Sequence, residues 1–134
     1  MKAAAPVIVF TSSMLFAQGK ISDFQWQYRL LVVSGADDKF AELLETEEAG
    51  LEERDLKVFI LSGSGEKEFA AKPELAAEFR ARLKPPAEKP MVYLIGKDGR
   101  TTLEWPLSEF TFAKLYASID AMPMRKREMR DGKS

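Results

Sequence analysis

The sequence predicts a single α/β domain with a central mixed sheet and helices on both faces. Short apolar runs rich in β-branched and aromatic residues alternate with longer segments whose apolar residues recur at helical spacing. The length of 134 residues suits one domain with a core of its own. The balance of 46% hydrophobic and 31% charged residues is typical of a globular protein.

The first half of the domain is predicted to be a strand, a helix and a second strand. Aromatic and polar side chains alternate over residues 22–29, which indicates an extended segment. The continuous apolar run over residues 30–33 is typical of a central strand. A helix follows, with Asp37 or Asp38 as its N-cap and an end or interruption at Gly50. Its apolar residues share one face: Phe40, Leu43, Leu44 and Leu51. Residues 56–61 form the second strand.

The second half is predicted to be a helix, a β-hairpin and a closing helix. Residues 73–83 form the first of these, with Pro73 in its first turn. Residues 91–95 and 100–105 are β-prone and flank Gly96-Lys97-Asp98-Gly99, and Asp-Gly in this setting is a hairpin signal. The last helix begins near Ser108 as cap and ends at Met122-Pro123.

This order of elements predicts a thioredoxin-like architecture. A right-handed crossover makes the first two strands parallel, and the hairpin adds two antiparallel ones. The sheet then has four strands, or five, and helices flank it. Pro90 directly precedes the third strand, where thioredoxin-like proteins often carry a cis-proline, and the sequence leaves its cis and trans forms equally open.

The chain contains no cysteine and no histidine. This excludes thiol redox catalysis, disulfides, Cys/His metal sites and a histidine base. We predict no catalytic residues and no cofactor. We also predict no metal ion, since the spacing of the acidic residues does not match that of a calcium-binding loop. The net charge of −1 argues against nucleic acid as a partner.

The first seventeen residues resemble a secretory signal peptide, with a lysine, an apolar stretch and a small residue at Ala17. Cleavage there would place residues 18–134 in the periplasm or outside the cell as a single thioredoxin-like domain. The alternative is a cytoplasmic protein in which residues 6–10 form a buried strand. The apolar run is shorter than a transmembrane helix requires.

Charge is distributed unevenly along the chain. Residues 37–55 contain nine acidic and two basic residues, which predicts a solvated acidic helix face. The tail, residues 124–134, contains five basic and two acidic residues. This short basic tail either contacts phosphates or acidic lipid, or folds back on the acidic helix.

Three stretches carry a resemblance to a known family. They are the aromatic segment leading into Arg29-Leu30-Leu31-Val32-Val33, then Tyr93-Leu94-Ile95-Gly96-Lys97-Asp98-Gly99, and finally Ile119-Asp120-Ala121-Met122-Pro123-Met124-Arg125 through Glu128-Met129-Arg130. Together they resemble the bacterial domain of unknown function 4174 family. The resemblance implies a small, usually exported protein of thioredoxin-like or peroxiredoxin-like fold. It also implies kinship with domains of coiled-coil domain-containing protein 80 and the sushi-repeat proteins. The family has no established activity, so the resemblance assigns a catalytic role to no residue.

The candidate site is the loop after the first strand, where thiol-active relatives of this fold carry their cysteine. Helix N-termini and free backbone N–H groups there can hold an extended peptide or a small anion. The candidate binding groove consists of Ser34, Gly35, Ala36, Asp37, Asp38, Lys89, Pro90 and Met91. The sequence favours a non-catalytic domain that binds a protein or peptide partner. The alternatives are an enzyme that uses Ser34 with Asp37 or Asp38, and a subunit whose partner supplies the missing thiol or metal. The oligomeric state stays open.

Overall fold

The computed structural model describes residues 19–132, so the predicted signal peptide and its cleavage site lie outside the described residues. Helices and strands follow in this order: η1 (Ile21–Phe24), β1 (Arg29–Ala36), α2 (Asp38–Thr46), α3 (Glu48–Glu53), β2 (Leu56–Gly63), α4 (Pro73–Leu83), β3 (Met91–Ile95), β4 (Thr101–Pro106), η2 (Leu107–Glu109), α5 (Phe112–Asp120) and α6 (Pro123–Arg130). None of the helices in this part of the chain is long and apolar enough to cross a membrane.

The strands form one mixed sheet in the order β2-β1-β3-β4. β1 is parallel to β2 and antiparallel to β3, and β3 is antiparallel to β4. In the middle of the sheet, Leu31 lies between Val58 of β2 and Leu94 of β3. The predicted mixed α/β fold with four strands is confirmed, and a fifth strand does not occur among residues 19–132.

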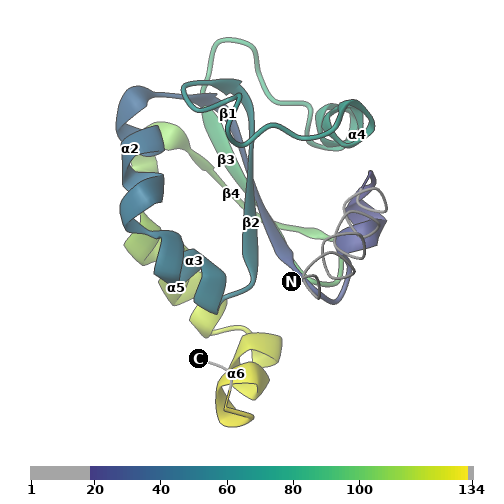
Figure 1. Cartoon of the computed structure of the whole chain (residues 1–134), viewed down its shortest axis with the longest axis vertical. Coiled ribbons are helices and arrows are strands. Elements are labelled where there is room, and N and C mark those ends of the chain that lie inside the picture. Colours follow the sequence, from purple (N-terminus) through teal and green to yellow (C-terminus); the bar gives the residue numbers. More distant parts are fainter. Residues whose placement is uncertain (1–18, 133–134) are drawn as a thin grey trace, which may run out of the picture.

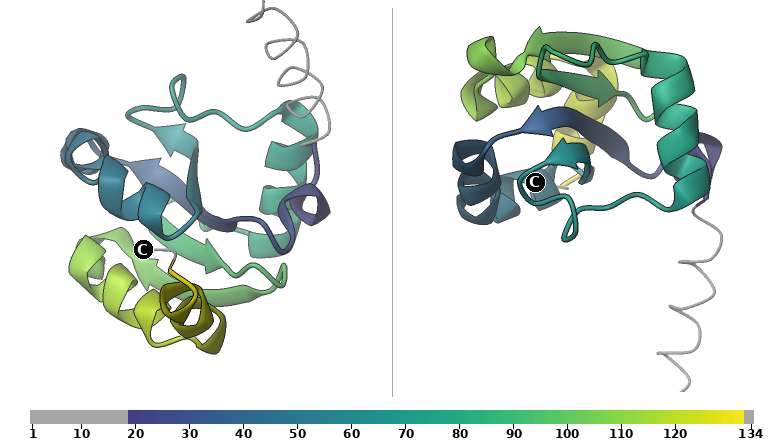
Figure 2. Two further views of the ribbon diagram at one scale, coloured as in Figure 1. Left: turned by 60° about the horizontal axis from the view of Figure 1, so that its bottom comes forward. Right: turned by 90° about the horizontal axis from the view of Figure 1, so that it is seen from above.

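Helices cover both faces of the sheet (Figures 1 and 2). α2, α3 and α5 lie on one face, and α4 and η1 lie on the other, while α6 lies beyond one end of the strands. Each face has its own apolar cluster. Phe40, Leu115 and Ile119 pack on the first face, and Phe24, Leu75 and Phe79 pack on the second. Because β1 contributes side chains to both clusters, its apolar run is continuous, as predicted for a central strand.

The predicted bounds of α4 and β3 are those of the structure, and Asp37 is the N-cap of α2. The helix predicted after the first strand, with an end or interruption at Gly50, is interrupted at Glu47 instead, which divides it into α2 and α3. Gly50 lies inside α3, where a Cβ would approach the hydroxyl oxygen of Tyr116 to 2.6 Å. This glycine therefore permits close packing rather than ending a helix. Leu43, predicted to face inward, is 38% exposed.

The extended segment predicted for residues 22–29 is also wrong. Residues 21–24 form the 3-10 helix η1, and a turn follows in which Trp26 has a φ of 70°. Phe24 is buried while Trp26 is 62% exposed, so their alternation in sequence does not reflect one strand face. A hydrogen bond of 2.6 Å from the Trp26 N–H to the Lys97 carbonyl fixes this turn against the β3–β4 hairpin.

In the second half of the domain the predicted cap of the last helix is wrong, and the structure answers two questions that the sequence left open. The cap of α5 is Thr111, which accepts a hydrogen bond from the Lys114 N–H, whereas Ser108 lies in η2. The peptide bond before Pro90 is trans, since the described residues contain no cis bond. The predicted tail forms a further helix, α6, and Arg125 of that helix contacts Glu53 of α3. Of the two alternatives for the tail, folding back on the acidic helix is the one observed.

Candidate functional site

Ser34, Gly35 and Ala36, predicted to lie in a loop, are instead the last residues of β1, and this end of β1 adjoins the start of β3. Ser34 pairs with Met91 across the two strands. Gly35 has a φ of +78°, and a Cβ on it would lie 3.2 Å from Pro90, so the two segments pack closely at this point. Lys89 beside them is exposed. Ser34 and Gly35 therefore lie close to Pro90 and Met91, and a role of the predicted groove in binding stays a prediction.

The acidic residues of this loop stabilise the local backbone. Asp37 accepts a hydrogen bond of 2.8 Å from the N–H of Phe40 at the start of α2. Asp38 is hydrogen bonded to the hydroxyl of Ser64, and the N–H of Ser64 donates to the carbonyl of Ala36 at 2.8 Å. The hydrogen bonds of the two carboxylates therefore do not lead to Ser34, the proposed nucleophile of the enzymatic alternative.

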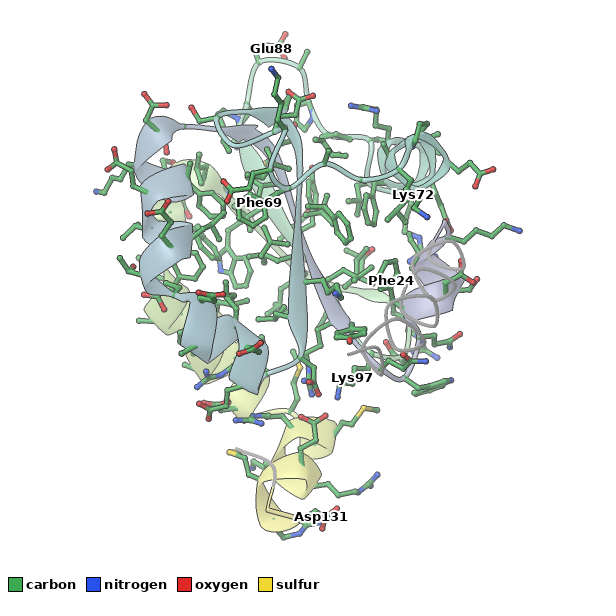
Figure 3. All side chains as sticks on the ribbon, in the orientation of Figure 1. Phe24, Phe69, Lys72, Glu88, Lys97 and Asp131 are labelled. Atoms are coloured by element: carbon green, nitrogen blue, oxygen red, sulfur yellow. The ribbon has the colours of Figure 1, made fainter. Side chains whose placement is uncertain are left out.

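A second group of polar residues lies at the end of the sheet where α6 docks, beside Lys97 in Figure 3. Eight charged side chains meet there, and we call them the ion cluster: Arg29, Glu53, Arg54, Asp55, Lys97, Asp120, Arg125 and Glu128. Arg29 and Arg125 are 1% and 0% exposed, which is unusual for charged residues. Sequence analysis named several of these residues as carriers of the family resemblance but assigned them no role.

Glu128 of α6 contacts both β1 and the turn between β3 and β4. Its carboxylate lies 3.2 Å from the Arg29 guanidinium and 2.6 Å from the Lys97 ammonium. Lys97 also lies 2.8 Å from Asp55. Burial alone would raise the pKa of Glu128, but the hydrogen bonds from Lys97 and Arg29 outweigh it and hold the pKa below its usual value.

Asp120, at the end of α5, likewise connects α6 to another part of the domain. It accepts hydrogen bonds from Arg54 at 2.9 Å and Arg125 at 3.2 Å. The bond from Arg54 lowers the pKa of Asp120, and Arg125 adds to this effect against the opposing effect of burial. No buried side-chain N or O atom within residues 19–132 lacks a hydrogen-bond partner. The ion cluster therefore fastens α6 to the sheet, and its groups are engaged with one another.

The exposed edge of β2 is the second candidate site. β2 is an edge strand, and in Figure 1 it runs between the two helical layers with its free side toward the viewer. The Asp55 carbonyl accepts from the Arg29 N–H of β1, whereas the Ile60 N–H points the other way and donates to the Phe69 carbonyl. Because backbone direction alternates along a strand, the N–H and C=O of Val58 also face outward.

A hollow lies on each side of this edge. The acidic hollow has a volume of about 540 Å³ and lies toward α2 and α3. The aromatic hollow has a volume of about 490 Å³ and lies toward α4 and η1. Both are lined by Leu56, Lys57, Val58, Glu68 and Phe69, so the backbone of β2 forms the divide between them.

The two hollows differ in their other lining residues. The acidic hollow adds these residues: Tyr28, Leu44, Glu45, Glu48, Leu51, Glu52 and Asp55. The aromatic hollow adds Phe24, Phe59, Ala70, Lys72 and Leu75. Sequence analysis recognised the acidic stretch but did not place it beside a strand edge. A third hollow, between α2 and α5, includes Asp37 of the predicted groove.

Comparison with known proteins places the chain in one family. No curated protein and no solved structure matches it. The family described as "Domain of unknown function (DUF4174)" matches residues 20–128, which include every residue of the ion cluster and of both hollows. The chain therefore belongs to the DUF4174 family.

Proposed function

We propose that this protein is a non-catalytic, thioredoxin-like domain that binds an extended segment of a partner protein along the edge of β2. The observation that carries this proposal is the outward-facing backbone of Val58 between two hollows. Strand addition takes its affinity from backbone hydrogen bonds, and it takes its specificity from pockets that receive alternate side chains. The edge of β2 offers both the backbone groups and the pockets that strand addition requires.

The thioredoxin-like assignment is supported by the strand order β2-β1-β3-β4 and by the packing of Gly35 against Pro90. The non-catalytic assignment is supported by the lack of cysteine and histidine in the sequence. The structural hydrogen bonds of Asp37 and Asp38 point in the same direction. Without thiol chemistry, such a domain can still recognise a partner through its surface shape and its backbone hydrogen-bond donors.

We further propose that the protein acts outside the cytoplasm. The lysine, apolar stretch and small residue of positions 2–17 support this location. N-terminal sequencing of the protein recovered from the envelope or the medium of a producing cell should give Gln18 as the first residue. Exported protein that begins at Met1 would contradict the cleavage.

Selection from a random heptapeptide library tests the binding role without assuming a sequence. We expect the full chain to enrich peptides that bind the wild type and fail to bind Val58→Pro. Proline removes the outward N–H but leaves the hydrogen bonds between β1 and β2 intact, because the Val58 N–H does not face β1. Val58→Thr is the matched control, since it keeps both the N–H and the β-branched shape.

Amide hydrogen exchange provides a measurement that needs no variant. An enriched peptide should slow exchange at the outward N–H groups of Leu56 and Val58. The N–H of Lys57, which faces β1, should change little. A library that enriches nothing, or enriched peptides that leave Val58 unprotected, would overturn the proposed site.

A further inference from the structure

We infer that the segment received by β2 carries basic side chains that alternate with apolar ones. This inference rests on the proposed function and names the chemistry of its partner. A strand paired with β2 points successive side chains to opposite faces of the sheet. One set would enter the acidic hollow and the other set would enter the aromatic hollow, so the lining of each hollow selects its own residue type.

The acidic hollow fits a long cationic side chain. Its floor includes Leu44, Leu51 and Val58, all of which belong to or pack against the apolar cluster on that face. Its rim carries exposed carboxylates from α2, from α3 and from the loop after β2. Lysine and arginine combine an apolar stem with a charged head, so the stem can cover the floor while the head reaches the rim.

The rim carboxylates are available to such a partner. Glu45, Glu48, Glu52 and Glu68 form no ion pair within the described residues, whereas Glu53 and Asp55 of the same stretch pair with Arg125 and Lys97. Four unpaired negative charges around one hollow produce a local negative potential that attracts cations.

The aromatic hollow favours an apolar side chain. Phe24 and Phe59 meet edge to face across it, with ring centroids 5.7 Å apart, and Figure 3 shows Phe24 and Phe69 on opposite sides of β2. Lys57 and Glu68 line both hollows, so neither charge distinguishes them. The aromatic rings do distinguish this hollow from the acidic one, and they favour an apolar side chain.

A second copy of this chain is a poorer occupant of the edge. Pairing of β2 with the β2 of another copy would bring two acidic hollows close together. Like charges opposed across an interface cost binding free energy. Charge complementarity therefore favours a basic segment of a different protein.

Two synthetic heptapeptides test the inference with the full chain. The first, KVKFKVK, has lysine at every odd position, and the second, EVEFEVE, has glutamate there. Fluorescence anisotropy should show binding of the lysine peptide at least about tenfold tighter than that of the glutamate peptide, and the difference should shrink as salt is raised.

Charge variants show whether the acidic hollow causes the preference. Glu45→Lys combined with Glu52→Lys should weaken binding of KVKFKVK at least about tenfold. Glu88→Lys combined with Glu109→Lys makes the same change in net charge at exposed residues that line neither hollow, and should change affinity less than about twofold. Equal losses in the two double variants would show only a net-charge effect and would overturn the inference.

The other outcomes separate the inference from the proposed function. If EVEFEVE binds as well as KVKFKVK, or if the library yields Val58-dependent peptides without basic residues, the partner chemistry is wrong and edge binding stands. If KVKFKVK binds equally to the wild type and to Val58→Pro, the site is elsewhere on the surface. A dimer that forms through β2 and that Val58→Pro dissociates would assign the edge to a second copy.

Discussion

The acidic stretch between Asp37 and Asp55 has two parts that use the same chemistry in opposite ways. At its end, Glu53 and Asp55 pair with Arg125 and Lys97, two cations that are almost fully buried. Along its middle, exposed carboxylates surround a hollow without ion pairs in the described residues. Charge in the first part fixes the fold. Charge in the second part is available for the recognition that we propose.

The comparison shows that composition alone does not reveal what an acidic segment does. Burial and partner geometry separate the two parts. Removing the carboxylate partner of a buried cation lowers the free energy of unfolding strongly, whereas changing an exposed carboxylate lowers it little. Substitutions should therefore divide sharply into those that affect stability and those that affect binding.

The largest effect is expected from Glu128→Gln. The change removes the charge that balances Arg29 and Lys97, and breaking a buried pair of this kind costs about 3–5 kcal/mol. Urea unfolding followed by circular dichroism measures the loss. Glu68→Gln is the control at an exposed residue and should shift the free energy of unfolding by less than about 0.5 kcal/mol. Similar losses of unfolding free energy in both variants would contradict the distinction between buried, paired carboxylates and exposed ones.

Acid should remove the same stabilisation. The folded pKa values of Glu128 and Asp120 lie below their unfolded values, so both groups contribute stability that is present above the unfolded pKa. That contribution is lost as the pH falls through the folded pKa, because the carboxylates then take up protons.

The difference in unfolding free energy between the wild type and Glu128→Gln should therefore be constant above about pH 5 and should shrink as the pH falls below about 4. Urea unfolding of both proteins across this range measures it. A difference that stays constant down to pH 2 would mean that Glu128 does not stabilise the fold through its charge.

An intermediate effect is expected from Tyr116→Phe, which changes a contact of α5 with the break between α2 and α3. The Tyr116 hydroxyl donates a hydrogen bond of 2.7 Å to Glu47 at the break between α2 and α3. Burial raises the pKa of Tyr116, and the hydrogen bond to Glu47 raises it further. Loss of this bond should cost about 1 kcal/mol in the free energy of unfolding. Tyr28→Phe, at a hydroxyl without a hydrogen bond among residues 19–132, is the matched control and should cost less.

The smallest effect is expected from Glu52→Lys. Glu52 is exposed near the end of α3, and a cation is favourable close to a helix C-terminus. The free energy of unfolding should change by less than about 0.5 kcal/mol. A loss above about 1 kcal/mol would show that the rim of the acidic hollow has a structural role after all.

Sequence patterns were sufficient for the sheet and its flanking helices because burial there follows local periodicity. β3 and α4 have apolar residues at the spacing of their own secondary structure, so their bounds could be predicted. In η1, by contrast, a hydrogen bond to Lys97 more than seventy positions away fixes the turn after the helix. No local pattern indicates such a contact.

The contacts of the charged residues in α6 could not be predicted from local sequence patterns either. The tail is polar and basic. Its helix is stabilised by ion pairs with Asp120 of α5 nearby and with two residues distant in sequence, Arg29 of β1 and Glu53 of α3.

The closeness of Ser34 and Gly35 to Pro90 and Met91 was predictable because it follows from the order of the strands. The hollows beside β2 were not, since they depend on how Phe69 and the acidic helices are placed around the edge.

The contact between Arg29 and Glu128 joins residues that are 99 positions apart. During synthesis, Arg29 emerges from the ribosome long before the carboxylate that neutralises it, so the buried arginine has no counterion until almost the whole domain has been made. Contacts of such long sequence separation slow folding, since the chain entropy must be lost before they form. The nascent domain is therefore expected to remain open until translation has passed α6, and we expect docking of the final helix on the first strand to be its last folding step.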